Sequence, residues 1–542
     1  MLNLLKKPWE SFKNKDQEMK SCGKVSSILF RLSLVLIFIA IVIGGFTRIY
    51  GVFHYNQFRD DQSRDAFVYA QMAEGHWPTL GPGSSVGGYW LSPIYYYLNF
   101  IFSFGSLDPA WQAFPNSLFE FLSTPLLIYF ILLLLNGFKS SRSWFLASAG
   151  GLWWSVFFND IIFSSMEWNP SSIPFFLLLF LILAHKSIQE TINYRNLTPE
   201  TKSNSNFPLL RGLGGLKPTL WWVLTGLIVA ILTGLHSTTL FTMPVVLGIV
   251  TLYTIWKARL KAYPVLFSWL TILIAHSSYI YGEIGRQWQN TTSLVQLVLK
   301  PSTVSHTLFE RFDRVIFNYF DLADFAYFDK LISFNTARLF MAAVLILAIL
   351  KFKGNRLLWF IIWSVWLVYS YTVSNFWGYI FMYYKNPIWF APIIFTAVFL
   401  NYVDYKKIRE VAVAILIGLF SLYSIYFNSI SSYNLLSARF GNERTVITYD
   451  MIAGLQALPD NSILCLNEFF KQPFEYINQV YTKDKSIKIT NDCTEPSTIK
   501  LYPKFGQNYT TLKVYPENSL DKNKIEKVYF ENEAVVFYST KM

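Results

Sequence analysis

The sequence predicts a polytopic α-helical membrane protein with a small C-terminal α/β domain outside the membrane. Only 15% of the 542 residues are charged and 53% are hydrophobic, whereas a soluble domain carries about 25% charged residues. Apolar runs of about 20 residues recur along the chain, and a helix of that length spans a bilayer. Short basic loops separate these runs, as expected for the cytoplasmic ends of membrane helices.

Eleven membrane-spanning helices are predicted when the basic loops are taken as cytoplasmic. The first apolar run, 28–46, follows a long polar N-terminus without a cleavage-site pattern, so we expect a retained helix and not a signal peptide. An odd number of crossings puts the N-terminal tail, 1–26, in the cytoplasm and the C-terminus outside, in a multi-pass protein of the cell membrane. The predicted spans are 27–48, 115–136, 143–159, 170–186, 219–236, 240–256, 263–282, 334–351, 357–375, 387–403 and 411–430.

The net charge of +12 is distributed in a way that excludes nucleic acid as the expected partner. The basic residues lie in loops on one side, and the segments on the other side hold few of them. The charge therefore encodes orientation, with membrane lipids as the surroundings. The basic loops are Lys6–Lys24, Lys139–Arg142, Lys186–Lys217, Lys257–Lys261, Lys351–Arg356 and Lys406–Arg409.

Two long outer loops, 50–114 and 283–330, interrupt the predicted membrane domain, 27–431. The first contains a polar helix candidate, Asp61–Glu74, and an aromatic run, Tyr89–Phe104, that suits a helix lying at the membrane interface. The second mixes aromatic and charged residues, and we expect it also to lie along the membrane surface.

The segment 432–542 has strand-like alternation and predicts a small α/β domain outside the membrane. Cys465 and Cys493 lie in it, where a disulfide persists; two free thiols buried in adjacent strands are the alternative. The expected elements are a helix at Thr445–Leu458 and strands at Ser462–Leu466, Ser486–Thr490, Thr510–Tyr515 and Val528–Phe537, the last with a break at Glu531–Glu533.

Four charged residues fall within six positions just beyond the first predicted span: Asp60, Asp61, Arg64 and Asp65. On a helix, the last three share one face. One carboxylate there can take a proton from an attacking acceptor, and arginine binds phosphate through paired hydrogen bonds. A capped helix start with solvated charges is the alternative, but charged residues close to the bilayer tend to be functional.

The stretch Asp61-Gln-Ser-Arg64 resembles the Asp-Glu-x-Arg-Tyr signature of the first outer loop in the bacterial lipid A aminoarabinose transferase family. Protein mannosyltransferases carry a related acidic signature, and both belong to the glycosyltransferase C superfamily, which uses polyprenyl-phosphate sugars. Further similarities to bacterial relatives follow in the same order over roughly the first 240 residues, at Gly81–Gly88, Leu91–Tyr97, Glu167–Pro170 and Leu235–Thr238.

The sequence also departs from the family pattern. Gln62 replaces the second acid of the signature, Asp65 replaces its tyrosine, and Leu91-Ser92 stand where a Glu-Lys pair is common. Specificity for aminoarabinose is therefore not implied. A sequon-binding oligosaccharyltransferase is disfavoured because Trp153-Trp154 is not followed by Asp-Tyr-Gly.

The resemblance implies a set of candidate site residues. Asp61 is the expected catalytic base, with Asp60 and Glu167 as further catalytic acids; Asp160 lies in the same predicted loop as Glu167. For Glu167, Asp160, Asn169 and His236, structural hydrogen bonding is an equal alternative. For Lys385, the alternative is a role as a snorkelling anchor at the membrane surface. The expected substrate-binding residues are Arg64, Asp65, Asn169, His236 and Lys385.

These observations predict transfer of a sugar from a polyprenyl-phosphate donor to an extracytoplasmic glycan, lipid or protein acceptor by inverting displacement. Nucleotide sugars are absent outside the cytoplasm, and the sequence has no Gly-rich nucleotide loop. We expect no cofactor and no essential metal. The alternatives are a transporter or flippase of lipid-linked sugars, which would place charges within the membrane, and an inactive protein that binds such lipids or a partner.

Overall fold

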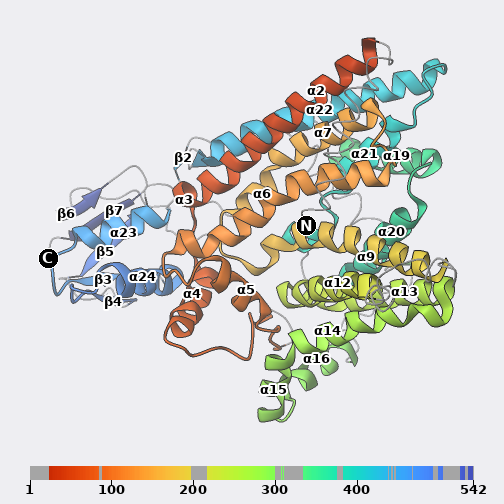
Figure 1. Ribbon diagram of the computed structural model, residues 1–542. Helices are drawn as coiled ribbons and strands as arrows, with labels where there is room; N and C mark the ends of the chain where they lie inside the picture. The colour runs from red at the N-terminus through yellow and green to blue at the C-terminus, as the bar shows by residue number, and fades with distance from the viewer. Residues whose placement is uncertain are drawn as a thin grey trace, which may run out of the picture.

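A bundle of long helices makes up most of the structure, a computed structural model that describes residues 24–84, 88–196, 216–299, 307, 309–310, 334–374, 382–436, 439–440, 443–444, 447–466, 468–491, 498–503, 525–531 and 535–540 (Figure 1). The first helix, α2 (Lys24–Gly45), continues through a π-helical turn, η1 (Phe46–Tyr50), into α3 (Gly51–Tyr55). The other bundle helices are α6 (Pro109–Leu134), α7 (Ser141–Ser155), α9 (Ile173–Asn196), α12 (Leu216–Leu235), α13 (Ser237–Ala258), α14 (Leu266–Ala275), α19 (Phe334–Lys351), α20 (Arg356–Ser374), α21 (Ala391–Asn401) and α22 (Ile408–Leu436).

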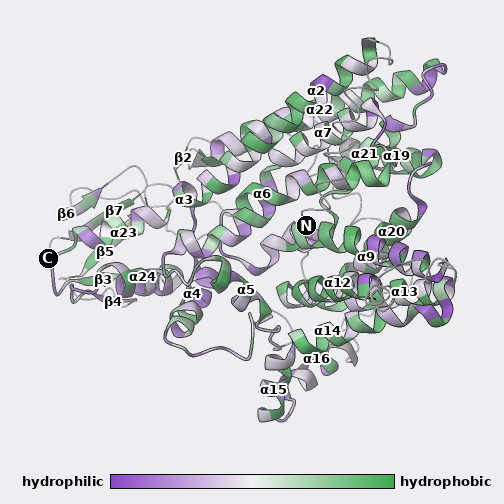
Figure 2. Cartoon of the chain, viewed as in Figure 1, coloured by the Kyte–Doolittle hydropathy of each residue, from purple (hydrophilic) through white to green (hydrophobic). Residues whose placement is uncertain are grey.

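Seven helical stretches of the described residues are long and apolar enough to cross a membrane. An eighth is added if α7 and the short helix α8 (Phe158–Ser164) count as one bent span. Apolar residues follow these helices along the bundle (Figure 2), and the prediction of an α-helical membrane protein is confirmed. All eleven predicted spans overlap a described helix, but α21 and the apolar part of α19 are short, so the count of eleven stays a prediction.

One predicted span, 143–159, is not a single helix. The helix α7 ends at Ser155, and α8 starts at Phe158 with a bend of 53° between them. The sequence hides this break because the apolar residues Val156, Phe157 and Phe158 continue across it. Asp160, expected in an outer loop, instead lies in the first turn of α8 with only 1% of its surface exposed.

A second break divides the longest apolar stretch, Ser237–Ala275, into two helices. Arg259 has a φ of 52° at the end of α13, a conformation that stops an α-helix. The chain then passes through a 3₁₀ turn, η3 (Arg259–Val265), into α14. At Gly226, a Cβ would lie 2.3 Å from the Ser268 carbonyl oxygen, so glycine permits α14 to pack closely on α12.

The basic loops meet at one end of the bundle. The Asn355 backbone N–H donates to the Leu134 carbonyl at 2.7 Å, and Lys351 pairs with Glu410 at 2.5 Å. Both contacts join loops that the charge pattern places in the cytoplasm. The segments that follow α2, α8, α12 and α20 meet at the other end, where the candidate site lies. This separation agrees with the predicted alternation of the loops.

The C-terminal region contains a five-stranded sheet with the order β4-β3-β5-β7-β6. β3 is parallel to β4 and β5, whereas β7 is antiparallel to β5 and β6. The predicted strand at Thr510–Tyr515 lies outside the described residues, and β5 was not predicted; the limits of the domain, 432–542, stay a prediction. The elements are β3 (Ile463–Cys465), β4 (Lys488–Thr490), β5 (Ile499–Pro503), β6 (Ile525–Glu531) and β7 (Val535–Thr540), with helices α23 (Thr448–Ala457) and α24 (Glu468–Tyr481).

Cys465, at the end of β3, is disulfide-bonded. The alternative of a free thiol at this position is therefore wrong. The two other cysteines of the sequence, Cys22 and Cys493, lie outside the described residues.

The first outer loop joins the bundle to the C-terminal sheet through helix α4 (Asp60–Ala73). Ala66 and Phe67 belong to the same hydrophobic cluster as Phe474 and Tyr476 of α24. The blue C-terminal elements consequently lie against the end of the bundle that carries α4 (Figure 1). The predicted interfacial run is represented by α5 (Ile94–Phe102). The predicted span 263–282 is divided into α14 and α15 (Ser277–Gly285). The second outer loop is represented by α16 (Gln289–Leu299), with most of its remainder outside the described residues.

Candidate active site

A cavity of about 440 Å³ lies where the first outer loop meets the ends of the bundle helices. Four predicted site residues line it, namely Asp61, Arg64, Asn169 and His236. They come from segments up to 175 positions apart and are brought together by the fold. The other lining residues are Gly83, Ser84, Gly88, Tyr89, Trp90, Leu91, Trp168, Pro170, Ser237, Tyr383 and Tyr384.

Asp61 and Arg64 project from the first turn of α4. Asp60 and Asp61 start this helix, where the partial positive charge of the N-terminus favours carboxylates, and Gln62 Oε1 accepts a hydrogen bond from the Arg59 backbone N–H at 3.2 Å. Arg64 Nη1 donates to Asp61 Oδ1 at 2.9 Å. The side chains of Asp61 and Arg64 are 52% and 33% exposed, so both face open space.

Asp65 lies beneath this pair and not in the cavity lining. Its side chain is fully buried, and its Oδ1 accepts hydrogen bonds from Arg64 Nε at 2.8 Å and from the Tyr96 hydroxyl at 2.7 Å. Burial raises the pKa of Asp65, although Arg64 and Tyr96 act in the opposite direction. Asp65 thus lies behind Arg64, where it fixes the guanidinium, and its predicted contact with the substrate stays a prediction.

Glu167 is also buried and lies outside the cavity lining. Its Oε1 accepts hydrogen bonds from the hydroxyls of Tyr69, at 2.6 Å, and Tyr95. Asn99 Nδ2 donates to the Tyr69 oxygen at 3.0 Å, which completes a network behind α4. Burial raises the pKa of Glu167 well above its ordinary value. This environment favours a neutral carboxylic acid that supports the site, and not a catalytic acid in contact with substrate.

The neighbouring residues Trp168 and Asn169 do reach the cavity. Asn116 of α6 holds this segment, because its Nδ2 donates to the carbonyls of Met166 and Trp168, each at 3.0 Å. Asn169 in turn donates to the Leu235 carbonyl at the end of α12. The segment is therefore tied to two helices, and Asn169 has a structural contact besides its position on the cavity wall.

His236 caps the start of α13 and faces two tyrosines. Its Nδ1 accepts a hydrogen bond from the Thr238 backbone N–H at 3.3 Å, so this nitrogen carries no proton and the neutral ring carries its N–H at Nε2. The ring packs edge-on against Tyr383 and Tyr384, at centroid distances of 5.6 and 5.1 Å. A neutral imidazole donor on the cavity wall follows from this arrangement.

Lys385 and Asp60 are not among the lining residues that the structure describes. Lys385 lies in a 3₁₀ turn, η4 (Met382–Ile388), with 4% of its surface exposed. The turn is fixed by Asn386, whose Nδ2 donates to the Pro170 carbonyl at 2.8 Å. Asp60 is exposed at the start of α4, and burial of part of its carboxyl and the charge of Asp61 raise its pKa.

The sequence interpretation did not include the aromatic residues of the wall. Tyr383 and Tyr384 stack at 4.7 Å between ring centroids, and Trp168 meets Tyr383 edge-on at 4.4 Å. Trp90 completes the group from the first outer loop, and Asn290 holds its backbone through hydrogen bonds in both directions. The run Tyr383-Tyr-Lys drew attention only to its lysine, although aromatic rings are common platforms for apolar and cyclic ligands.

No group of three or more His, Cys, Asp or Glu side chains is placed to hold a metal ion within the part of the chain that the structure describes. The expectation of no essential metal stays a prediction.

Comparison with solved structures identifies the fold. The chain is similar to ArnT from Cupriavidus metallidurans bound to undecaprenyl phosphate, with a TM-score of 0.50, 11% identity, and coverage of 93% of this chain and 97% of that chain. ArnT is an aminoarabinose transferase of the glycosyltransferase C superfamily. At this identity the likeness shows the fold alone, and the resemblance to that superfamily is confirmed at the level of the fold.

Another match is the archaeal oligosaccharyltransferase AglB from Archaeoglobus fulgidus, in complex with an inhibitory peptide and a dolichol-phosphate. Its TM-score is 0.40 at 11% identity, over 84% of this chain and 64% of that chain. No protein-family model matches the sequence, and neither does any of the curated proteins compared with it.

Proposed function

We propose that the protein transfers a sugar from a polyprenyl-phosphate donor to an acceptor outside the cytoplasm, with inversion at the anomeric carbon. The observation that carries this proposal is the pair Asp61 and Arg64 on the wall of a cavity, at the end of the bundle opposite the basic loops, in a fold similar to that of ArnT. A carboxylate and a guanidinium 2.9 Å apart provide a proton acceptor and a phosphate ligand within one turn of helix.

The chemistry requires one displacement. The acceptor hydroxyl or amine gives its proton to the Asp61 carboxylate and attacks the anomeric carbon, while the bond from that carbon to the phosphate oxygen breaks. The phosphate leaves with the lipid, and Arg64 and the Nε2–H of His236 stabilise its charge. Asp65 holds Arg64 from behind, which limits the reorganisation that phosphate binding demands. We place Lys385 next to this phosphate as a second cation.

The aromatic wall suits the sugar. Trp168, Tyr383 and Tyr384 present ring faces and edges in one part of the cavity. Flat rings pack against the C–H faces of a sugar, while the polar groups around them accept and donate hydrogen bonds. The donor sugar, the acceptor and the pentose or hexose type are not assigned by these contacts.

A transporter of lipid-linked sugars is the competing account. Its charges would line a path through the membrane. Buried charges do occur within the bundle, at Arg48, Glu120 and Asp160, but Arg48 pairs with Asp160 and none of the three lines the cavity. The paired charges that do face open space lie on α4, which favours an enzyme.

Mass spectrometry of envelope lipids, glycans and glycoproteins tests the proposal. We compare cells with the wild-type protein, cells without it, and cells with Asp61→Asn. The enzyme account expects one sugar modification to disappear in both altered strains, while the lipid-linked sugar accumulates. If Asp61→Asn restores the modification to the level of the wild type, Asp61 is not the base and the transporter account becomes the better one.

A further inference from the structure

A cluster of buried charges lies apart from the cavity, where η1, α6 and α8 meet. Arg48, Glu120 and Asp160 are at most 1% exposed. Arg48 donates to Asp160 Oδ2 from Nε at 2.8 Å and from Nη2 at 2.6 Å. Charged side chains within a membrane bundle are costly and tend to have a defined role, yet the proposed reaction does not use these residues.

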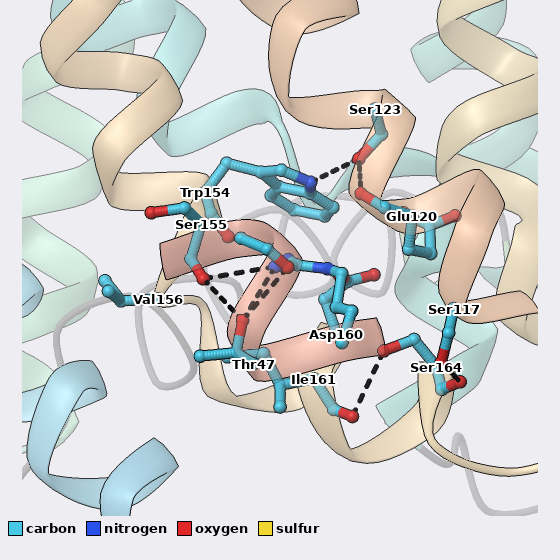
Figure 3. A network of polar contacts seen from close by, with 12 residues as sticks. Thr47, Ser117, Glu120, Ser123, Trp154, Ser155, Val156, Asp160, Ile161 and Ser164 are labelled. Atoms are coloured by element: carbon cyan, nitrogen blue, oxygen red, sulfur yellow. Dashed lines mark hydrogen bonds and ion pairs between the residues drawn. The ribbon is translucent and has the colours of Figure 1, made fainter. Parts of the chain in front are cut away.

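Arg48 also donates hydrogen bonds to the free backbone carbonyls at the C-terminal end of α7. A helix end leaves backbone carbonyls without partners, and here the carbonyls of Ser155 and Trp154 accept hydrogen bonds from Arg48 Nη1 and Nη2 at 3.1 and 2.9 Å. One planar guanidinium thus joins the last turn of α7 to Asp160 in the first turn of α8. Figure 3 shows Trp154, Ser155 and Asp160 gathered around this point.

Helix α8 leads directly to the cavity wall. Its last residue, Ser164, accepts a hydrogen bond at its carbonyl from Ser117 Oγ at 2.6 Å (Figure 3). Asn116, the neighbour of Ser117 on α6, holds the Met166 and Trp168 carbonyls. The segment between the helix break and the cavity is therefore held by Arg48 at its start and by α6 at its end.

We propose that Arg48 is a positioning residue, which fixes the break between α7 and α8 and thereby sets the place of Trp168 and Asn169 in the cavity wall. The π-helical turn at 46–50 puts this arginine at the break and not on the lipid-facing side. This inference rests on the proposed function only where it names the ligand of the cavity as a polyprenyl phosphate. The position of the segment that contains Trp168 and Asn169 can be tested without that ligand.

Glu120 has a different part in the cluster. Its Oε2 and Asp160 Oδ1 are buried oxygens without a donor among the described residues. Glu120 therefore takes no part in the hydrogen bonds by which Arg48 joins α7 to α8. Glu120→Gln retains the acceptor that binds the Phe175 backbone N–H and is the matched control.

The experiment compares wild type, Arg48→Lys and Glu120→Gln as full-length proteins in lipid nanodiscs. Lysine keeps the charge but lacks the planar fork that bonds two carbonyls and a carboxylate together. Amide hydrogen exchange reports on residues 164–172, and binding of undecaprenyl phosphate gives a Kd and a number of sites per protein. Arg48→Lys is expected to raise exchange in 164–172 selectively and to weaken Kd by about fivefold or more at an unchanged number of sites.

Glu120→Gln is expected to match wild type in both measurements. A general loss of structure would instead raise exchange throughout and reduce the number of sites at an unchanged Kd, and that result would overturn the proposal. Unchanged exchange in 164–172 in Arg48→Lys would overturn it too. If the wild-type protein binds no undecaprenyl phosphate, the proposed function fails, and the exchange data alone then support or reject the positioning role.

Discussion

Asp61 and Asp60 are neighbours in the chain, but only Asp61 lines the cavity. Successive residues on a helix point about 100° apart, so a one-residue shift separates a site residue from a solvated one. Asp61→Asn keeps the size of the side chain and removes its charge. We expect a loss of about 10²- to 10⁴-fold in the transfer rate, the usual effect of removing a general base.

Asp60→Asn is the matched control in the same assay on purified protein. It changes the same kind of side chain at the same helix end and should retain most of the transfer rate. The opposite ranking of the two variants would show that the catalytic carboxylate is Asp60 and that the family signature is misaligned by one residue.

The burial of Glu167 predicts that the stability of the folded protein depends on pH. Burial raises its pKa in the folded protein above the ordinary value of 4.5, so the folded state binds a proton more tightly than the unfolded state. Its contribution to stability is complete below pH 4.5 and is lost as the pH rises through the raised pKa. Glu167→Gln mimics the neutral acid and should show a flatter dependence of Tm on pH.

Thermal unfolding of the two proteins in detergent, from pH 4.5 upwards, measures this difference. The Tm of the wild type should fall further than that of Glu167→Gln across the series. Parallel curves would mean that Glu167 stays ionised in the folded protein despite its burial.

The sequence alone could predict the exposed half of the site but not the buried half. Asp61 and Arg64 follow from a local spacing, and His236 follows from its place at a helix end. The burial of Asp65 and Glu167 depends on tyrosines from other segments, such as Tyr96, which local spacing does not reveal. In the 3₁₀ turn η4, Tyr383 and Tyr384 line the cavity and Lys385 is not among the lining residues, a difference that local spacing does not reveal.

At the scale of elements, α24 supports the helix that carries the site. Tyr476 of α24 is fully buried and packs on Phe58 and Phe67, at centroid distances of 5.4 and 5.2 Å. Its hydroxyl donates to the Leu107 carbonyl at 2.8 Å and accepts from Gln112 at 2.9 Å. The C-terminal region therefore contacts α4 through Phe67, which is not among the lining residues of the cavity.

Tyr476→Ala should loosen α4. Truncation of a buried aromatic residue costs about 3–5 kcal/mol, and this contact lies directly behind the helix. We expect amide exchange across 60–73 to rise by about tenfold or more, with a parallel fall in transfer. Tyr449→Ala, at a position 58% exposed in the same domain, is the control. Equal exchange in both variants would mean that the domain does not support α4.

The lengths of the apolar runs in the sequence predicted the positions of the helices, because a helix needs about 20 apolar residues to cross a bilayer. It did not predict the bend after Ser155, where the backbone groups freed by the break bond to Arg48 from a distant helix. The positive φ of Arg259 agrees with the predicted division between 240–256 and 263–282, since a basic residue in an apolar run marks a loop at the membrane surface.

At the scale of the whole molecule, the two ends of the bundle differ in charge and in chemistry. Contacts such as Lys351 with Glu410 join the basic loops at one end, and the cavity and the C-terminal sheet lie at the other. The positive-inside rule places the basic end in the cytoplasm, so Asp61 and the C-terminus should both face outward. This orientation also fits a lipid-linked donor, because nucleotide sugars are confined to the cytoplasm.

A pair of reporter fusions tests this orientation. A reporter that is active only in the cytoplasm should stay silent when it is fused after Met542, and it should be active when it is fused after Asn196, at the end of α9. The second fusion controls for expression, because it ends in a predicted basic loop. Activity of the reporter after Met542 together with silence after Asn196 would show that the orientation in the membrane is the reverse of the predicted one and that the site faces the cytoplasm. A lipid donor would then no longer be required, and the proposed reaction would lose its main topological support.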